Sequence, residues 1–140
     1  MTDNSVHAAI RQKLHSAGRI LIFSHIRPDG DAVGSLLALG LALQEAGKQV
    51  EMVLKDGVPG GFRFLTGSDQ IMPAPSGPAD LFIVVDVSEL SRIGEGFDLG
   101  QPDIQVDHHI TNLNFARLNL VEPEAVATSA ILAECLPLWG

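Results

Sequence analysis

Hydrophobic and polar residues alternate along the chain in blocks that predict helices and strands in turn. Residues 5–17 place apolar side chains on one face of a helix, and Gly18 follows the last of them. The short apolar run at 19–24 has the length and composition of a buried strand. The longer apolar segment 33–46, closed by Gly47, predicts a second helix.

The rest of the chain continues this alternation. Four further segments read as strands: 49–54, 80–86, 104–106 and 118–121. Residues 55–79 are rich in glycine and proline and predict an irregular connection, with one short helical turn at 62–65. A last helix is expected at 125–136, with Pro123 at its start. This order predicts an α/β fold with a mostly parallel sheet flanked by helices. Right-handed crossovers then place the carboxyl ends of the parallel strands along one edge.

Composition narrows the class of protein. The chain has 140 residues, 46% of them hydrophobic and 19% charged, as expected for one folded globular domain. The formal net charge of −8 argues against a broad, non-specific nucleic-acid surface, unless divalent cations make the acidic cluster locally positive. A single cysteine, Cys135, excludes an intramolecular disulfide and a cysteine-based zinc site.

The sequence shows no sign of a targeting or membrane segment. Residues 1–5 lack the basic start and apolar run of a signal peptide. No apolar run approaches the ~18 residues that a membrane span needs. We therefore expect a cytoplasmic protein with no membrane association.

Unusual polar residues follow three of the predicted strands. They are His25, Asp29 and Asp31 after the first, Asp86 after the third, and Asp107, His108 and His109 after the fourth. No lysine lies among them, and Arg27 is the one nearby arginine. Gathering so many carboxylates at one sheet edge without counter-charge would cost several kcal/mol in repulsion and desolvation. Bound divalent cations would remove that cost.

The residue types indicate which cations this group of side chains would bind. Oxygen donors with a minority of imidazoles, and no thiolate, favour Mn²⁺ or Mg²⁺ over a structural Zn²⁺. More donors are present than one ion needs, so two ions that share a carboxylate are expected, with Asp86 as the bridge. Such ions sit ~3.5–4 Å apart and hold a phosphoryl group between them. The expected helix start at Gly34 and Ser35 would add backbone N–H groups for an anionic substrate.

Each cluster alone also has an ordinary structural explanation. Residues 28–31 contain the residue types of a turn, Asp86 could cap a helix, and residues 108–109 could be a plain loop pair. Their joint arrival at one sheet edge favours the metal centre. The chain lacks the Gly-x-Gly-x-x-Gly, Gly-Lys-Ser/Thr and Gly-x-Ser-x-Gly motifs, which excludes the common dinucleotide, P-loop and serine-hydrolase sites.

Three of these features together resemble a known family. The motif His-x-x-Pro-Asp-Gly-Asp-Ala-x-Gly-Ser at 25–35, the strand ending in Asp86, and Asp-His-His-x-x-Asn-x-x-Phe at 107–115 resemble the DHH phosphoesterase superfamily. With Arg63-Phe64-Leu65, they look like its nanoRNase branch, which degrades short oligoribonucleotides and often dephosphorylates 3′-phosphoadenosine 5′-phosphate. The resemblance covers essentially the whole chain.

The resemblance implies a set of metal ligands. His25 and Asp29 would bind one Mn²⁺, Asp31 and His108 would bind the other, and Asp86 would bridge them. Mg²⁺ could replace Mn²⁺ in the same ligand set.

It also implies roles around the metals. His109 would contact the substrate phosphate or stabilise developing charge, and Asp107 would orient a neighbouring ligand. Arg92, at a spacing that the family often shows, would be structural or a weak phosphate contact.

Two features of the family are missing from residues 1–140. One is a further metal-binding aspartate well beyond the Asp-His-His segment, and the other is a second domain, with a Gly-Gly-Gly-His-type motif, that binds the nucleotide. We therefore expect residues 1–140 to be the N-terminal portion of a DHH catalytic domain in a longer enzyme, which could form a homodimer.

Three functions remain open at this point. The first is Mn²⁺-dependent hydrolysis of phosphodiester or phosphomonoester bonds in short oligonucleotides or nucleotides, by two-metal activation of water. The second is the chemistry of an inorganic pyrophosphatase or a cyclic-dinucleotide phosphodiesterase of the same superfamily. The third is a catalytically weak module that binds metal or nucleotide.

Overall fold

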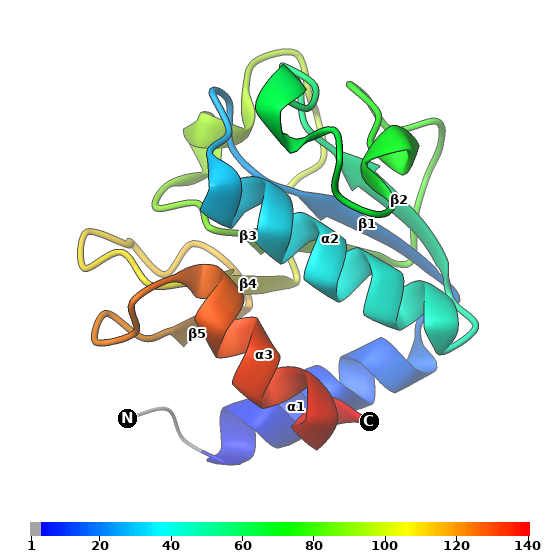
Figure 1. Ribbon diagram of the computed structural model, residues 1–140. Helices are drawn as coiled ribbons and strands as arrows, with labels where there is room; N and C mark the ends of the chain where they lie inside the picture. Colours follow the sequence, from blue (N-terminus) through cyan, green and yellow to red (C-terminus); the bar gives the residue numbers. More distant parts are fainter. Residues whose placement is uncertain (1–3) are drawn as a thin grey trace.

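The computed structural model describes residues 4–140. Residues 1–3, which belong to the segment 1–5 that lacks signal-peptide features, lie outside the described residues. Five parallel strands form one sheet (Figure 1). They are β1 (Arg19–Phe23), β2 (Gln49–Val53), β3 (Leu81–Val85), β4 (Ile104–Asp107) and β5 (Leu118–Val121). The α-helices of this region are α1 (Asn4–Ser16), α2 (Gly30–Glu45) and α3 (Thr128–Trp139). The predicted α/β class with a parallel sheet is confirmed.

The strand order creates a switch in chain direction across the sheet. The order is β2-β1-β3-β4-β5, so the chain leaves β1 for β2 on one side and returns to β3 on the other. Within the register, Ile22 of β1 lies between Met52 and Ile83. In open α/β sheets, ligands bind outside the carboxyl ends of the strands at such a switch point. Here that point is the gap between the ends of β1 and β3.

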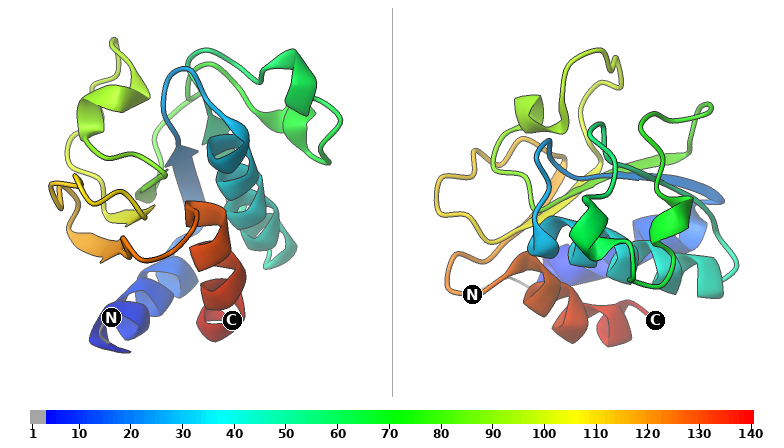
Figure 2. Two further views of the ribbon diagram at one scale, coloured as in Figure 1. Left: turned by 60° about the vertical axis from the view of Figure 1, so that its left-hand side comes forward. Right: turned by 45° about the horizontal axis from the view of Figure 1, so that its top comes forward.

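The two faces of the sheet are covered differently. Ile20 and Ile22 of β1 pack into the larger core with residues of α1, α2 and α3, which lie on one side of the sheet (Figure 2). Leu21 and Phe23 point to the opposite face, where the 3₁₀ helix Leu90–Ile93 and the loop after it cover a smaller cluster. This alternation follows from the two-residue period of a strand, and it makes the central strands apolar on both faces.

Helix α2 begins three residues earlier than the expected start at residue 33. Asp29 is its N-cap, with extended backbone angles and a side chain that accepts a hydrogen bond from the Ala32 N–H at 2.9 Å. The residues 28–31 looked like a turn, but aspartate is also among the best N-cap residues. The capping role extends the helix into the acidic cluster.

The last helix begins later than expected, at Thr128 instead of Ala125. Residues 122–127 form a loop in which the Ala125 N–H donates to the Glu122 carbonyl, so Pro123 does not start the helix. The expected short helical turn at 62–65 lies slightly earlier, at Gly60–Phe62. No helix among residues 4–140 is long and apolar enough to cross a lipid bilayer.

Candidate metal centre

The structure gathers the acidic and imidazole side chains at one edge of the sheet. His25 follows β1, Asp86 follows β3, and Asp29 and Asp31 stand at the start of α2. Asp107 is the last residue of β4, and His108 and His109 follow it. These segments are far apart in sequence, and the parallel sheet brings their ends together at the switch point between β1 and β3.

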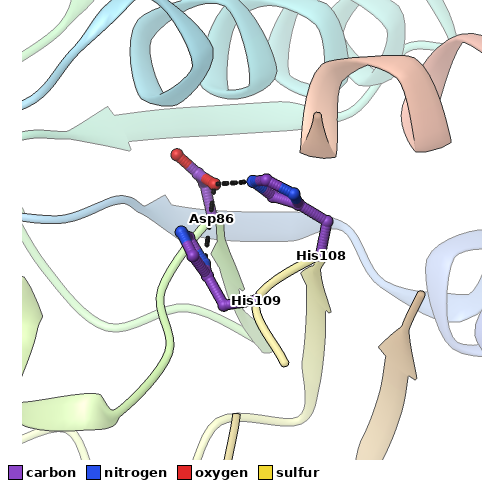
Figure 3. A group of neighbouring side chains, drawn as sticks. All are labelled: Asp86, His108 and His109. Carbon is purple, nitrogen blue, oxygen red and sulfur yellow. Dashed lines mark ion pairs between the residues drawn. The ribbon is translucent and has the colours of Figure 1, made fainter. Parts of the chain in front are cut away.

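Asp86 lies in the middle of the group and is 2% exposed. Its Oδ2 is 3.4 Å from His25 Nε2. Its Oδ1 is 3.6 Å from His108 Nε2 and 4.0 Å from His109 Nδ1, so the carboxylate faces the two histidines of the loop after β4 (Figure 3). The two oxygens of one carboxylate therefore face two different sets of donors.

The backbone of Asp86 is itself unusual. Its φ of +61° lies in the left-handed region, which few residues other than glycine adopt. The Asp86 N–H still donates to the Val106 carbonyl at 2.9 Å, which ties this residue to β4. Such backbone strain concentrates at functional sites, and here it aims the carboxylate across the strand ends.

His25 presents one ring nitrogen to the carboxylates. Its Nδ1 lies 2.6 Å from the Ile26 carbonyl oxygen, which can only accept, so Nδ1 carries the hydrogen. Nε2 then faces Asp86 and, at 3.9 Å, Oδ1 of Asp29. The hydrogen bond with Asp86 raises the pKa of His25 against the opposing effect of burial. This nitrogen therefore attracts a cation, either a proton or a metal.

His108 faces the other side of the group. Its Nε2 is 3.5 Å from Oδ2 of Asp31 and 3.6 Å from Oδ1 of Asp86. Burial raises the pKa of Asp31, but the backbone N–H groups of Ser129 and Thr128 outweigh it, and the pKa falls below its usual value. Burial raises the pKa of Asp86, against the bond from His25. The two aspartates thus differ in how strongly the protein alone stabilises their charge.

Asp107 is fully buried and positions His109. Its Oδ1 lies 2.6 Å from His109 Nδ1, and its Oδ2 accepts a hydrogen bond from Asn112 Nδ2 at 2.7 Å. Since a carboxylate accepts, Nδ1 of His109 carries the hydrogen and Nε2 is left free of this contact. Asn112 also donates to the Val87 carbonyl at 3.1 Å, which anchors the arrangement to the chain after β3.

A cleft of about 280 Å³ opens beside this group. His25, Asp86 and His109 line it, together with Arg92. Arg92 is mostly exposed, and its nearest carboxylate oxygen is on Glu89 at 3.9 Å. Within residues 4–140, no lysine or arginine forms an ion pair with the aspartates at this sheet edge. Arg92 thus stands at the rim of the cleft rather than among the carboxylates.

The donor set suits a metal ion. Two groups of side chains each hold ligand atoms within 4.8 Å of one another: His25, Asp29 and Asp86, and Asp86, His108 and His109. Asp86 belongs to both. The donors are carboxylate oxygens and imidazole nitrogens without a thiolate, because Cys135 is buried in α3, where burial raises its pKa to about 11.

Gly34 and Ser35 do not lie at the start of the helix, where the sequence placed them. Both residues lie in the second turn of α2, where backbone N–H groups are used in the helix's own hydrogen bonds. Ser35 is fully buried, and its hydroxyl donates to Oδ1 of Asp31 at 3.3 Å. Because Asp29 caps the helix, the free N–H groups of its first turn precede these two residues.

Sequence reasoning missed the contribution of α3. The N–H groups of Thr128 and Ser129 donate to Asp31 at 3.0 and 2.9 Å, and the Thr128 hydroxyl donates to Oδ1 of Asp86 at 3.0 Å. The adjacent Thr-Ser pair is a typical helix-start signal, and it marked the true beginning of α3 more closely than Pro123 did. Nothing in the linear order connects it to Asp31, 97 residues earlier.

Comparisons with known proteins identify relatives of this chain. The chain is 36% identical over 131 residues to the bifunctional oligoribonuclease and PAP phosphatase NrnA of Thermus thermophilus, a match that covers 88% of this chain and 38% of that protein. The chain thus spans well under half the length of this curated relative.

Solved structures share the fold. An exopolyphosphatase-related protein from Bacteroides fragilis is 27% identical, with a TM-score of 0.90 over 99% of this chain and 44% of that one. The exonuclease RecJ, in a crystal structure with bound manganese, is 18% identical, with a TM-score of 0.53 over 94% of this chain and 35% of that one. The second likeness concerns the fold alone.

A match to a family model shows which family the chain belongs to. The description "DHH family, N-terminal domain" matches residues 19–137, which include every strand of the sheet and all the side chains of the candidate metal centre. The resemblance indicated by the three sequence motifs is confirmed, and the chain belongs to the DHH family through its N-terminal domain.

Proposed function

We propose that this chain forms the metal-binding part of a phosphoesterase that hydrolyses phosphodiester or phosphomonoester bonds of short oligonucleotides or nucleotides with two Mn²⁺ ions. The observation that carries the proposal is the placement of Asp86, whose two carboxylate oxygens face two separate sets of donors. Because the chain spans 38% of the NrnA relative, the activity is proposed for the full-length protein that contains it.

The proposed ligands follow the two sides of Asp86. His25 and Asp29 stand on the Oδ2 side, and His108 and Asp31 stand on the Oδ1 side. Ions on both sides would neutralise the carboxylates, whose charge no lysine or arginine of residues 4–140 pairs with. Bound divalent ions supply charge neutralisation at a phosphoryl group and lower the pKa of a water molecule toward neutrality. Mg²⁺ fits the same oxygen-rich set.

The protein's own groups complete the site. Asp107 holds His109 with Nδ1 protonated, so the imidazole meets the cleft in one tautomer and one orientation. In that state, Nε2 of His109 can accept a proton, and the protonated ring can donate to a phosphate oxygen. Arg92 at the rim offers a guanidinium for a substrate phosphate. We propose His109 as a catalytic residue, Asp107 as its positioning residue and Arg92 as a substrate contact.

The likeness to an exopolyphosphatase-related protein supports a second candidate. That protein is 27% identical and superimposes over nearly the whole of this chain. The metal centre would act on the phosphoanhydride bonds of polyphosphate or pyrophosphate by the same chemistry, since the ions contact phosphoryl oxygens and not the nucleoside.

A substrate panel tests the proposal and separates the two candidates. The full-length protein is incubated with Mn²⁺ and, in turn, a ribodinucleotide, 3′-phosphoadenosine 5′-phosphate, pyrophosphate and a short polyphosphate. Release of mononucleotide or phosphate from the first two substrates supports the nucleotide function. Cleavage of only the last two supports the second candidate. No turnover of any substrate, with no Mn²⁺ binding by calorimetry, would overturn both.

A further inference from the structure

The start of α3 is joined to the acidic group by three hydrogen bonds. Thr128 and Ser129 donate their backbone N–H groups to the two oxygens of Asp31, at 3.0 and 2.9 Å. Thr128 also donates its hydroxyl to Oδ1 of Asp86 at 3.0 Å. One residue of α3 thus holds two of the proposed metal ligands, which come from α2 and from the end of β3.

The backbone bonds explain how α3 begins. Its N-cap residue, Ala127, has no side-chain oxygen, so it cannot satisfy the first free N–H groups of the helix. Asp31 takes that role from another helix, and the charge of its carboxylate suits the positive end of α3. These two bonds cap the start of α3, and they come from backbone N–H groups and not from the hydroxyl of Thr128.

The hydroxyl bond is not needed for the cap. Thr128 is fully buried, and a carboxylate can only accept, so the hydroxyl hydrogen points at Asp86. This bond occupies the same oxygen that faces His108 and His109, while Oδ2 faces His25. A donor on Oδ1 restricts rotation of the carboxylate, and β-branching restricts rotation of the threonine itself.

We infer that Thr128 is a positioning residue of the metal centre, whose hydroxyl fixes the Asp86 carboxylate so that each oxygen faces its own set of ligands. This inference rests on the proposed two-metal function. It assigns α3 a part in the site that the Asp-His-His motif does not contain. Residues that orient metal ligands in this way typically change metal affinity about 10–100-fold when they are lost.

The variants T128V and T128S test the hydroxyl in the full-length protein. Valine keeps the branched shape and the backbone N–H but removes the donor, and serine keeps the donor without the methyl group. The matched control is S68A, which removes another buried hydroxyl, bonded to the Arg63 carbonyl at 2.8 Å, from a turn that contributes no proposed ligand. Should T128V fail to fold, T128A takes its place in the comparison with T128S.

The measurements are Mn²⁺ affinity by titration calorimetry and the melting temperature without metal. We expect T128V to weaken Mn²⁺ binding about 10–100-fold, T128S to stay within about threefold of wild type, and S68A to lower the melting temperature without changing Mn²⁺ affinity. If T128V binds Mn²⁺ as wild type does, or if T128S is as weak as T128V, the inference is overturned while the proposed function stands. Absence of Mn²⁺ binding in wild type overturns the metal centre and the inference together.

Discussion

The carboxylates at the two ends of the parallel sheet have different kinds of partner. At the amino end, Glu51 pairs with Arg19 at 3.0 Å and accepts hydrogen bonds from Ser76, while Asp80 accepts from the Gly18 and Arg19 N–H groups. Each carboxylate there has its own donors and a cation close by. At the carboxyl end, the aspartates share histidines and, within residues 4–140, form no ion pair with lysine or arginine.

This difference suggests that the amino end stabilises the fold, and it supports the proposed metal binding at the carboxyl end. At the amino end, the protein itself supplies hydrogen-bond donors and a nearby cation for Glu51 and Asp80. At the carboxyl end, a buried carboxylate at a positive φ is faced by ring nitrogens of three histidines, an arrangement that gains most from added positive charge. Substitutions at the two ends should therefore have opposite consequences for stability and metal binding.

The largest effect is expected for D86N. The amide keeps the shape of the side chain but removes the charge shared by both proposed ions, so hydrolysis by the full-length protein should fall by about 10³-fold or more. Steady-state kinetics with Mn²⁺ measures it. Activity within tenfold of wild type would contradict the bridging role.

The stability of D86N without metal distinguishes the two ends of the sheet further. Removing one of several crowded, poorly compensated carboxylates should leave the free energy of unfolding in EDTA unchanged or raise it by about 1–2 kcal/mol. The matched variant at the amino end, E51Q, should lower it instead. A clear loss of stability in metal-free D86N would show that the protein already compensates the charge of Asp86 without a metal ion.

Metal binding itself is the next test. Because Mn²⁺ would bind the folded state, saturation at about a hundred times the dissociation constant should stabilise the wild-type protein by about 2.7 kcal/mol. Thermal unfolding with Mn²⁺ and then with excess EDTA measures the gain and its reversal. The gain should be absent in D86N and intact in E51Q.

A smaller effect is expected for N112A. Loss of the Asn112 amide leaves Asp107 with one partner fewer, which should loosen His109 and lower kcat about 10–100-fold. Mn²⁺ affinity should change little, because Asn112 contacts none of the proposed ligands directly.

The control for this variant is N119A, whose side chain bonds Gln105 and Ala116 in the same region. It should lower stability without an equal loss of kcat. A shift in the pH profile of kcat with N112A, absent from N119A, would attribute the effect to His109. Equal losses in both variants would make Asn112 a purely structural residue.

The smallest effect concerns pH at the amino end. Burial raises the pKa of Glu51, but bonds from Ser76 and Arg19 outweigh it, and the backbone N–H groups of Arg19 and Gly18 lower the pKa of Asp80. A lowered pKa stabilises the folded state above the ordinary values of 4.5 and 3.8, and this contribution is lost as the pH falls through the folded-state values.

E51Q should therefore lower the free energy of unfolding by less than about 1 kcal/mol at pH 7, with the difference from wild type shrinking below pH 4.5. Urea denaturation across this pH range measures it. A difference that grows toward acid would contradict the sign, and a change in Mn²⁺ affinity would break the separation between the two ends of the sheet.

Much of the fold can be predicted from the sequence, because the hydrophobic pattern that predicts each strand lies within a short segment. The apolar runs at 19–24 and 80–86 became β1 and β3 within a residue of the expected bounds, and residues 118–121 became β5 without change. Once parallel strands are expected, their carboxyl ends must share an edge, so the proximity of His25, Asp86 and residues 107–109 follows from order along the chain.

One error arose where a residue serves the helix that directly follows it. Asp29 looked like part of a turn, yet it caps α2, so Gly34 and Ser35 lie in the second turn of the helix and not at its start. Local composition cannot distinguish these two uses of aspartate, since both depend on whether the following residues continue as a helix.

The fold class, the sheet edge and the residue types gathered there follow from the sequence alone, because hydrophobic period and residue chemistry are properties of short segments. The direction in which Asp31 and Asp86 face depends on tertiary packing. Asp31 caps α3 and Thr128 holds Asp86, each through a contact between separate elements. Hydrogen bonds are directional and short in range, so they exist only after packing has brought these elements together.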